Sequence, residues 1–164
     1  MSGVDELINR GIADSNNLFI TGGSAGGIAT AYAIGLTDRF RAAVVAKPVI
    51  NWVSKVLTAD SYIYQIPYQF PGMPWDEYEH YWKRSPLSLV GNVTTPTMLI
   101  TGEDDQRTPI SETEQFYQAL KLRKIDSIMV RVPGSSHGIA GRPSRLNAKV
   151  DNILAWFDRY RSID

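Results

Sequence analysis

The 164-residue sequence contains no cysteine, has only two histidines and carries no excess of either charge. Without cysteine there is no disulfide framework, no thiol nucleophile and no thiolate-bound metal. The 17 Lys and Arg balance the 17 Asp and Glu, so no basic surface is available for nucleic acid or anionic membranes. No apolar run approaches the roughly 20 residues of a membrane-spanning helix. We therefore expect no nucleic-acid partner, no membrane partner, no metal and no cofactor.

The composition is that of a globular protein, with 43% apolar and 21% charged residues. We find no internal repeat, low-complexity tract or flexible linker, which predicts a single domain over residues 1–164. The N-terminal segment is acidic and amphipathic, unlike a secretory signal, and we expect a cytoplasmic protein.

Short apolar runs predict four strands, at residues 17–21, 42–46, 97–101 and 127–132. None of the runs alternates between apolar and polar residues, as expected for strands that are buried on both faces. Because helical patterns separate the runs, the sequence predicts an α/β fold with a mostly parallel sheet and helices on both faces. In such sheets the functional residues lie beyond the carboxyl ends of the strands.

The helical patterns have recognisable starts and faces. Ser2 is expected to cap a short first helix with Asp5 in its first turn, and Ser111 with Glu114 to form a capping box for a helix through about residue 122. A small-residue helix is expected over residues 25–36, and one helical piece is expected near residues 75–83 of the long, aromatic, proline-rich segment 48–95. The last helix presents one shared apolar face, made of Leu146, Val150, Ile153, Leu154 and Phe157.

The first predicted strand leads into a glycine-rich turn that contains Ser24 in a G-x-S-x-G pattern. Between a strand and a helix, this pattern is typical of a sharp turn that raises a serine hydroxyl above the sheet, with Gly22 and Gly26 relieving backbone crowding. The N–H of Ala25, at the helix N-terminus, is the expected oxyanion donor. Taken alone, the motif also fits a plain glycine-rich turn or a phosphate-binding loop, although the usual phosphate-loop spacings are absent.

Two further strands are followed by residues that complete a catalytic triad. An acidic turn with Asp104 and Asp105 follows the third strand, and a loop with His137 follows the fourth. Serine, acid and histidine occur here in the chain order of the α/β-hydrolases. His137 would accept the serine proton, the acid would orient the imidazole, and an acyl-enzyme would form. The other histidine, His80, is expected to pack within the aromatic segment or to face solvent.

At these residues the sequence resembles the catalytic domain of the prolyl oligopeptidase family of serine peptidases, in particular its acylaminoacyl-peptidase and dipeptidyl-peptidase-like branch. The similarity lies in residues 10–27, 38–52, 85–109 and 132–139. In this family the triad acid lies three residues after the glycine of its turn. Counted from Gly102, that position is Asp105. The resemblance thus implies a triad of Ser24, Asp105 and His137.

The resemblance also implies a primary specificity pocket that is formed after the second strand. Its candidate residues are Val49, Trp52, Tyr62 and Tyr64. An apolar, aromatic pocket would favour a hydrophobic or prolyl side chain at the cleaved bond. Alternatively, the aromatic residues only pack the long segment. Arg107 matches a family arginine after the acid, and we expect it to be a surface charge or to pair with Glu103.

Catalytic domains of the family begin earlier and usually follow a β-propeller. The resemblance therefore implies an incomplete α/β-hydrolase fold whose leading strands are missing, together with the loop that gives a second oxyanion donor. The strand at 17–21 would then be an exposed apolar edge, which favours association. We expect a marginally stable chain that is oligomeric or dependent on the missing N-terminal part.

Three functions remain open at this stage. The first is a serine-type peptidase that acts on short peptides. The second is a catalytically incompetent fragment that serves as an assembly or binding module. The third is a carboxylesterase with the same triad.

Overall fold

Four parallel strands in chain order form the sheet of this protein, whose computed structural model describes residues 1–163. The strands are β1 (Phe19–Gly23), β2 (Ala42–Ala46), β3 (Thr97–Gly102) and β4 (Ser127–Val132). All four predicted strands are confirmed. β1 begins and ends two residues later than expected, because Gly22 and Gly23 extend it and pair with Val45 and Ala46 of β2.

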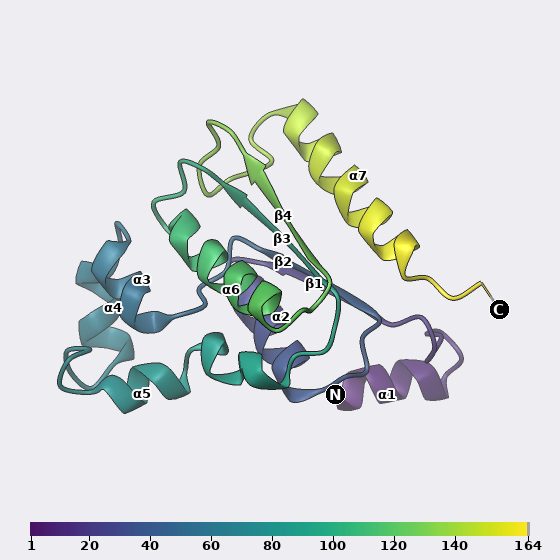
Figure 1. The fold of residues 1–164 in the computed structure, drawn as a ribbon, viewed down its shortest axis with the longest axis horizontal. Helices are drawn as coiled ribbons and strands as arrows, with labels where there is room; N and C mark the ends of the chain where they lie inside the picture. Colours follow the sequence, from purple (N-terminus) through teal and green to yellow (C-terminus); the bar gives the residue numbers. More distant parts are fainter. Residues whose placement is uncertain (164) are drawn as a thin grey trace.

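Helices precede the first strand, connect the strands and follow the last of them (Figure 1). They are α1 (Ser2–Asn9), α2 (Ala25–Leu36), α3 (Trp52–Thr58), α4 (Tyr62–Gln69), α5 (Tyr78–Lys83), the 3₁₀ helix η1 (Pro86–Asn92), α6 (Ile110–Leu122) and α7 (Pro143–Arg159). Within residues 1–163, no helix is both long enough and apolar enough to cross a membrane.

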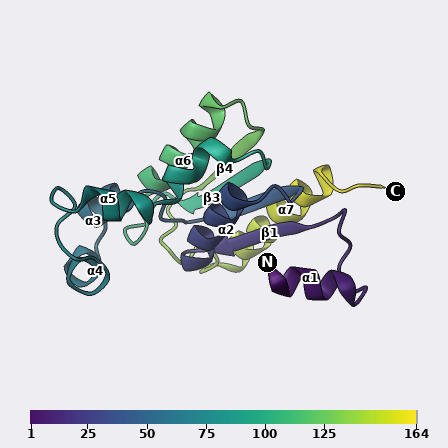
Figure 2. The same cartoon turned by 90° about the horizontal axis from the view of Figure 1, so that it is seen from below.

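The sheet is covered on both faces, as predicted (Figure 2). Helices α2 and α6 pack on one face, where Ile34 and Phe116 meet Val45. Helix α7 packs on the other face, where Trp156 meets Val44. Every residue of β2 and β3 is buried, which explains why these strands appear in the sequence as unbroken apolar runs.

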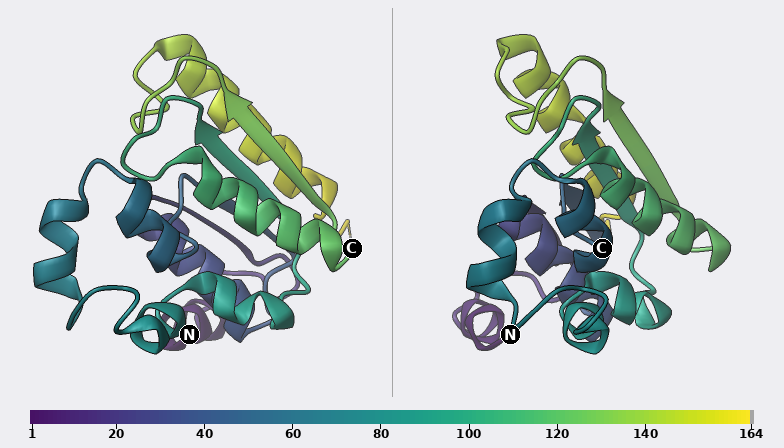
Figure 3. Two further views of the ribbon diagram at one scale, coloured as in Figure 1. Left: turned by 60° about the vertical axis from the view of Figure 1, so that its left-hand side comes forward. Right: turned by 90° about the vertical axis from the view of Figure 1, so that its left-hand side faces the viewer.

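The segment between β2 and β3 contains more helix than expected. We predicted one helical piece, whereas the structure has α3, α4, α5 and η1, of which α3 to α5 lie together to one side of the sheet (Figure 3). Their small core is aromatic, with Phe70 stacked on Tyr81 at 3.9 Å between ring centroids. His80 packs edge-on against Phe70, which confirms the expectation that it packs within the aromatic segment rather than facing solvent. Pro67 and the short helix lengths had obscured the helical pattern.

Two predicted helix caps do not form. Met1 rather than Ser2 is the N-cap of α1, so the Ser2 hydroxyl lies inside the first turn. Helix α6 begins at Ile110 because Pro109 occupies the N-cap position and starts the helix before Ser111. Glu114 then forms an ion pair with Arg131 of β4 at 3.0 Å instead of completing a capping box.

The predicted apolar face of α7 is divided. Ile153 and Phe157 pack toward the sheet beside Trp156. The other three residues of that face stay exposed, at 44%, 43% and 59% for Leu146, Val150 and Leu154. Leu154 lines a surface hollow beside Phe19 of β1, and in the described sheet β1 pairs only with β2. An open strand edge and an uncovered apolar helix stripe therefore lie close together.

Candidate active site

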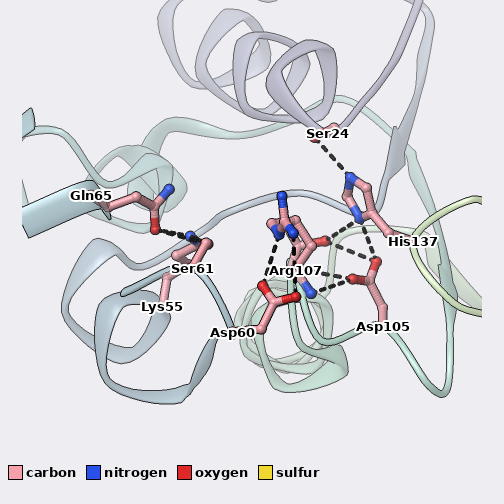
Figure 4. A network of polar contacts seen from close by, with 9 residues as sticks. Ser24, Lys55, Asp60, Ser61, Gln65, Asp105, Arg107 and His137 are labelled. Carbon is pink, nitrogen blue, oxygen red and sulfur yellow. Dashed lines mark hydrogen bonds and ion pairs between the residues drawn. The ribbon is translucent and has the colours of Figure 1, made fainter. Parts of the chain in front are cut away.

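The strand ends bring Ser24, Asp105 and His137 to one edge of the sheet (Figure 4). Ser24 follows β1, Lys47 follows β2, the turn with Asp105 follows β3, and the loop with His137 follows β4. Because the strands are parallel, their carboxyl ends lie at the same edge. The three residues expected to form a triad are thus brought together from distant parts of the chain.

Ser24 occupies a backbone conformation that few non-glycine residues adopt, with φ of 58° and ψ of −117°. Its N–H donates a hydrogen bond to the Ala46 carbonyl at 3.1 Å, which fixes the turn to the end of β2. Helix α2 begins at the next residue, Ala25, where main-chain N–H groups have no acceptor within the helix. The Ala25 N–H is therefore suited to stabilise negative charge near the serine hydroxyl.

The crowding at this turn is relieved by a different pair of glycines from the one expected. A Cβ atom on Gly22 would lie 2.2 Å from the carbonyl oxygen of Gly26, so Gly22 cannot be replaced without moving the backbone. A Cβ on Gly26 itself would meet nothing within 4 Å, so the predicted role of Gly26 is wrong in this respect. Gly27 is needed instead, because its Cβ would lie 2.5 Å from the Ala46 carbonyl oxygen.

His137 contacts both of the other triad candidates. Its Nε2 lies 3.0 Å from Ser24 Oγ, and its Nδ1 lies 2.8 Å from Asp105 Oδ2. Asp105 is buried, and its Oδ1 accepts hydrogen bonds from the N–H groups of Arg107 and Thr108, each at 2.9 Å. Asp104 is exposed. The geometry therefore distinguishes the two aspartates, which their residue type could not do.

Two residues that the sequence did not indicate support this arrangement. The Thr108 hydroxyl lies 3.0 Å from Asp105 Oδ2 and 3.1 Å from the Lys47 carbonyl oxygen. Lys47 Nζ donates a hydrogen bond to the His137 carbonyl oxygen at 2.6 Å, and burial lowers the pKa of its ammonium. The position of Lys47 directly after β2 was the one available signal, since the triad candidates also follow strands.

A cavity of about 200 Å³ lies beside Ser24. Val49 and Trp52 line it, as the resemblance implied. Tyr62 and Tyr64 are not among its lining residues, and they are 50% and 70% exposed. The polar side chains of Gln65 and Gln69 line it instead, because they are four residues apart on one face of α4.

Arg107 is a surface charge, as one of its two expectations held, and it pairs with Asp60 at 2.8 Å between Nε and Oδ1 rather than with Glu103. The backbone explains the difference, because the Asp60 N–H donates to the Gln106 carbonyl at 2.9 Å and so brings the end of α3 to the acidic turn. Glu103 instead pairs with Arg131 at 2.9 Å. The hydrogen bond from Arg107 lowers the pKa of Asp60.

Lys55 is the least expected member of the cavity wall, because its side chain is almost fully buried, with 1% exposure. Its Nζ donates to Ser61 Oγ at 2.8 Å and to Gln65 Oε1. Burial lowers the pKa of the ammonium to about 8; the Arg107 charge acts in the same direction, and the carboxylates of Asp60 and Glu112 oppose it. Within residues 1–163, no group of three or more His, Asp or Glu side chains is placed to hold a metal ion.

Comparison with known proteins identifies the family of the chain. Residues 1–163 match the prolyl oligopeptidase family. The chain is 36% identical over 163 residues to the uncharacterized peptidase YuxL of Bacillus subtilis, covering 98% of this chain and 25% of that protein. It is 33% identical over 167 residues to the acylamino-acid-releasing enzyme of Arabidopsis thaliana, covering 96% of this chain and 22% of that protein.

Solved structures show the same relationship. The fold matches the acylaminoacyl peptidase of Pyrococcus horikoshii with a TM-score of 0.87 at 27% identity, over 96% of this chain and 26% of that one. It matches a puromycin-hydrolyzing peptidase of Mycobacterium tuberculosis with a TM-score of 0.88 at 28% identity, over 99% and 25%. The chain thus spans about a quarter of the length of these relatives and matches part of their α/β-hydrolase domain. It belongs to the prolyl oligopeptidase family of serine peptidases.

Proposed function

We propose that residues 1–164 form one incomplete α/β-hydrolase domain that carries the catalytic triad of a serine peptidase. The observation that carries this proposal is the chain of contacts from Ser24 Oγ through the His137 imidazole to Asp105. A serine hydroxyl is a weak nucleophile unless a base accepts its proton, and His137 Nε2 lies at hydrogen-bond distance for that transfer.

The reaction proceeds in two steps. Ser24 Oγ attacks the scissile carbonyl while its proton moves to His137, and the Ala25 N–H donates to the developing oxyanion. The imidazolium then gives the proton to the leaving amine, which leaves an acyl group on Ser24. Water attacks this ester with His137 again as the base. The acid product leaves, and the proton returns from His137 to Ser24 Oγ to restore the free serine. Asp105 holds the Nδ1–H tautomer throughout.

Short peptides are the proposed substrates. An acylaminoacyl peptidase that is similar to this chain, with a TM-score of 0.88 at 27% identity, has been crystallised with the peptide inhibitor Z-Gly-Gly-Phe-chloromethyl ketone. In our proposal the cavity beside Ser24 receives the side chain of the residue whose carbonyl is attacked.

Labelling with a fluorophosphonate tests the proposal directly. We expect covalent modification of the wild-type chain and none of Ser24→Ala, with circular dichroism showing that both are folded. A folded wild-type chain that does not react would refute it. Comparing p-nitrophenyl esters with acyl-aminoacyl anilides then separates a peptidase from a carboxylesterase, since the latter would hydrolyse only the esters.

A second candidate function is that of an assembly module without turnover. It is favoured by the open edge of β1 and by the exposed residues Leu146, Val150 and Leu154 on α7. Such surfaces favour association. Sedimentation would then show an oligomer. Alternatively, the chain would fold only together with the remaining part of a hydrolase domain. A cooperatively melting monomer would exclude this role.

A further inference from the structure

The cavity beside Ser24 contains a buried cation that no carboxylate neutralises. Charged side chains are rarely buried unless they are paired. Within residues 1–163, none of the ion pairs involves Lys55. Its two acceptors, Ser61 Oγ and Gln65 Oε1, are both neutral. The burial of Lys55 therefore costs free energy that its protein contacts offset only in part.

Neighbouring carboxylates are engaged elsewhere. Both oxygens of Asp60 accept from the Arg107 guanidinium, at 2.8 and 3.3 Å. One oxygen of Glu112 accepts from the N–H groups of Ile50 and Asn51 at 2.9 and 2.8 Å, and the other accepts from a serine hydroxyl. Neither carboxylate is within ion-pair distance of Lys55. An anionic ligand from solution would therefore supply the charge partner that the ammonium lacks.

The position of the ammonium is suited to a ligand in the cavity. Lys55 Nζ lies 5.9 Å from the centroid of the Trp52 ring, and both residues line the cavity with Ser24. An ammonium has three N–H donors, of which the side chains of Ser61 and Gln65 use two. Val49 and Trp52 provide an apolar wall for methylene groups, while Lys55 and the α4 glutamines provide a polar one.

We propose that Lys55 selects peptides whose residue bound in the Ser24 cavity is aspartate or glutamate. This inference rests on the proposed function, and it replaces the hydrophobic or prolyl preference expected from the sequence. The substrate carboxylate accepts the third N–H of Lys55 in a charge-assisted hydrogen bond. A neutral side chain of the same shape lacks this contact.

A binding measurement tests the inference without requiring catalytic turnover. Affinities of N-acetyl-glutamate and N-acetyl-glutamine for the full chain are measured by calorimetry at pH 7. We expect the glutamate ligand to bind about 10- to 100-fold more tightly, the range for a hydrogen bond between charged groups. Lys55→Met should remove the difference. Gln65→Glu, which places a carboxylate against the ammonium, should also reduce it, so the test does not depend on one variant folding.

The matched control is Lys83→Met, at an exposed position of α5, which should keep the full preference. Equal affinities of the two ligands for the wild-type chain would overturn the inference, whatever the reactivity of Ser24.

The same preference should appear as a higher kcat/KM for acetyl-glutamyl than for acetyl-glutaminyl or acetyl-leucyl p-nitroanilide. Efficient cleavage with a leucyl preference would refute the inference and leave the peptidase function standing. Lys55-dependent binding of N-acetyl-glutamate to a chain that does not react with a fluorophosphonate would support the inference and count against the peptidase function alone.

Discussion

The Nζ of Lys47 donates a hydrogen bond to the main-chain carbonyl of His137 across 90 positions of the sequence. The contact joins the end of β2 to the loop between β4 and α7, which has no regular structure at His137. The Lys47 carbonyl in turn accepts from Thr108, next to Asp105. One residue thus connects the acid turn and the histidine loop.

Replacing Lys47 by methionine should therefore loosen His137 without removing any triad side chain. We expect the rate of fluorophosphonate labelling to fall about tenfold, because a hydrogen bond from a charged group contributes about 1.5–3 kcal/mol. A positioning role also predicts a changed pH profile of labelling. Lys83→Met serves as the control, and an unchanged rate and profile in Lys47→Met would exclude the role.

Asp105 and Asp104 form a natural pair of variant and control. Asp105→Asn should keep the fold but lower the labelling rate by about 10⁴, since an amide favours the wrong imidazole tautomer. Asp104→Asn, one residue away and exposed, should react at the wild-type rate. If the two variants were affected equally, the assignment of the acid would be wrong.

Glu112 of α6 forms hydrogen bonds to the segment that leads into α3, which forms part of the cavity wall. It is fully buried and accepts the N–H groups of Ile50 and Asn51, which lead into α3. Each buried group left without a partner costs about 1–3 kcal/mol. We expect Glu112→Ala to lower the free energy of unfolding in urea by roughly 3 kcal/mol, and Glu112→Gln by less. A loss below about 0.5 kcal/mol, typical of surface sites, would contradict this role.

We expect the ionisation of Lys55 to make the free energy of unfolding depend on pH. Its folded pKa of about 8 lies below the ordinary value of 10.5, so between these pH values the unfolded chain binds more protons than the folded chain. The stability of the wild type relative to Lys55→Met should therefore rise as the pH increases through this window and be constant below it. Urea unfolding of both proteins at pH 7, 9 and 10 measures the difference. A difference that falls over this range would contradict the direction of the shift.

Much of the fold follows from simple features of the sequence. The apolar runs at β2 and β3 were visible because every residue of those strands is buried between layers of side chains. The order of Ser24, Asp105 and His137 was visible because each follows a strand of one parallel sheet. Their contacts depend on that topology and not on local propensity.

The missed features have equally specific reasons. Gly22 continues β1 although glycine is rare in strands, because the close approach of the Gly26 backbone requires a glycine there. Gly23 extends the strand by one more residue through its pairing with Ala46. Lys55 was not predicted as a cavity residue because lysine is usually exposed, and only the packing of α3 against α4 buries it. In both cases tertiary contacts outweigh the ordinary preference of the residue.

Ser24 also shows where the requirements of folding and of chemistry conflict. Its φ of 58° suits glycine, and a side chain in such a conformation costs about 1–3 kcal/mol. We expect Ser24→Gly to unfold at a higher urea concentration than Ser24→Ala, and both to be unreactive. The most readily stabilised variant of this chain is then an inert one.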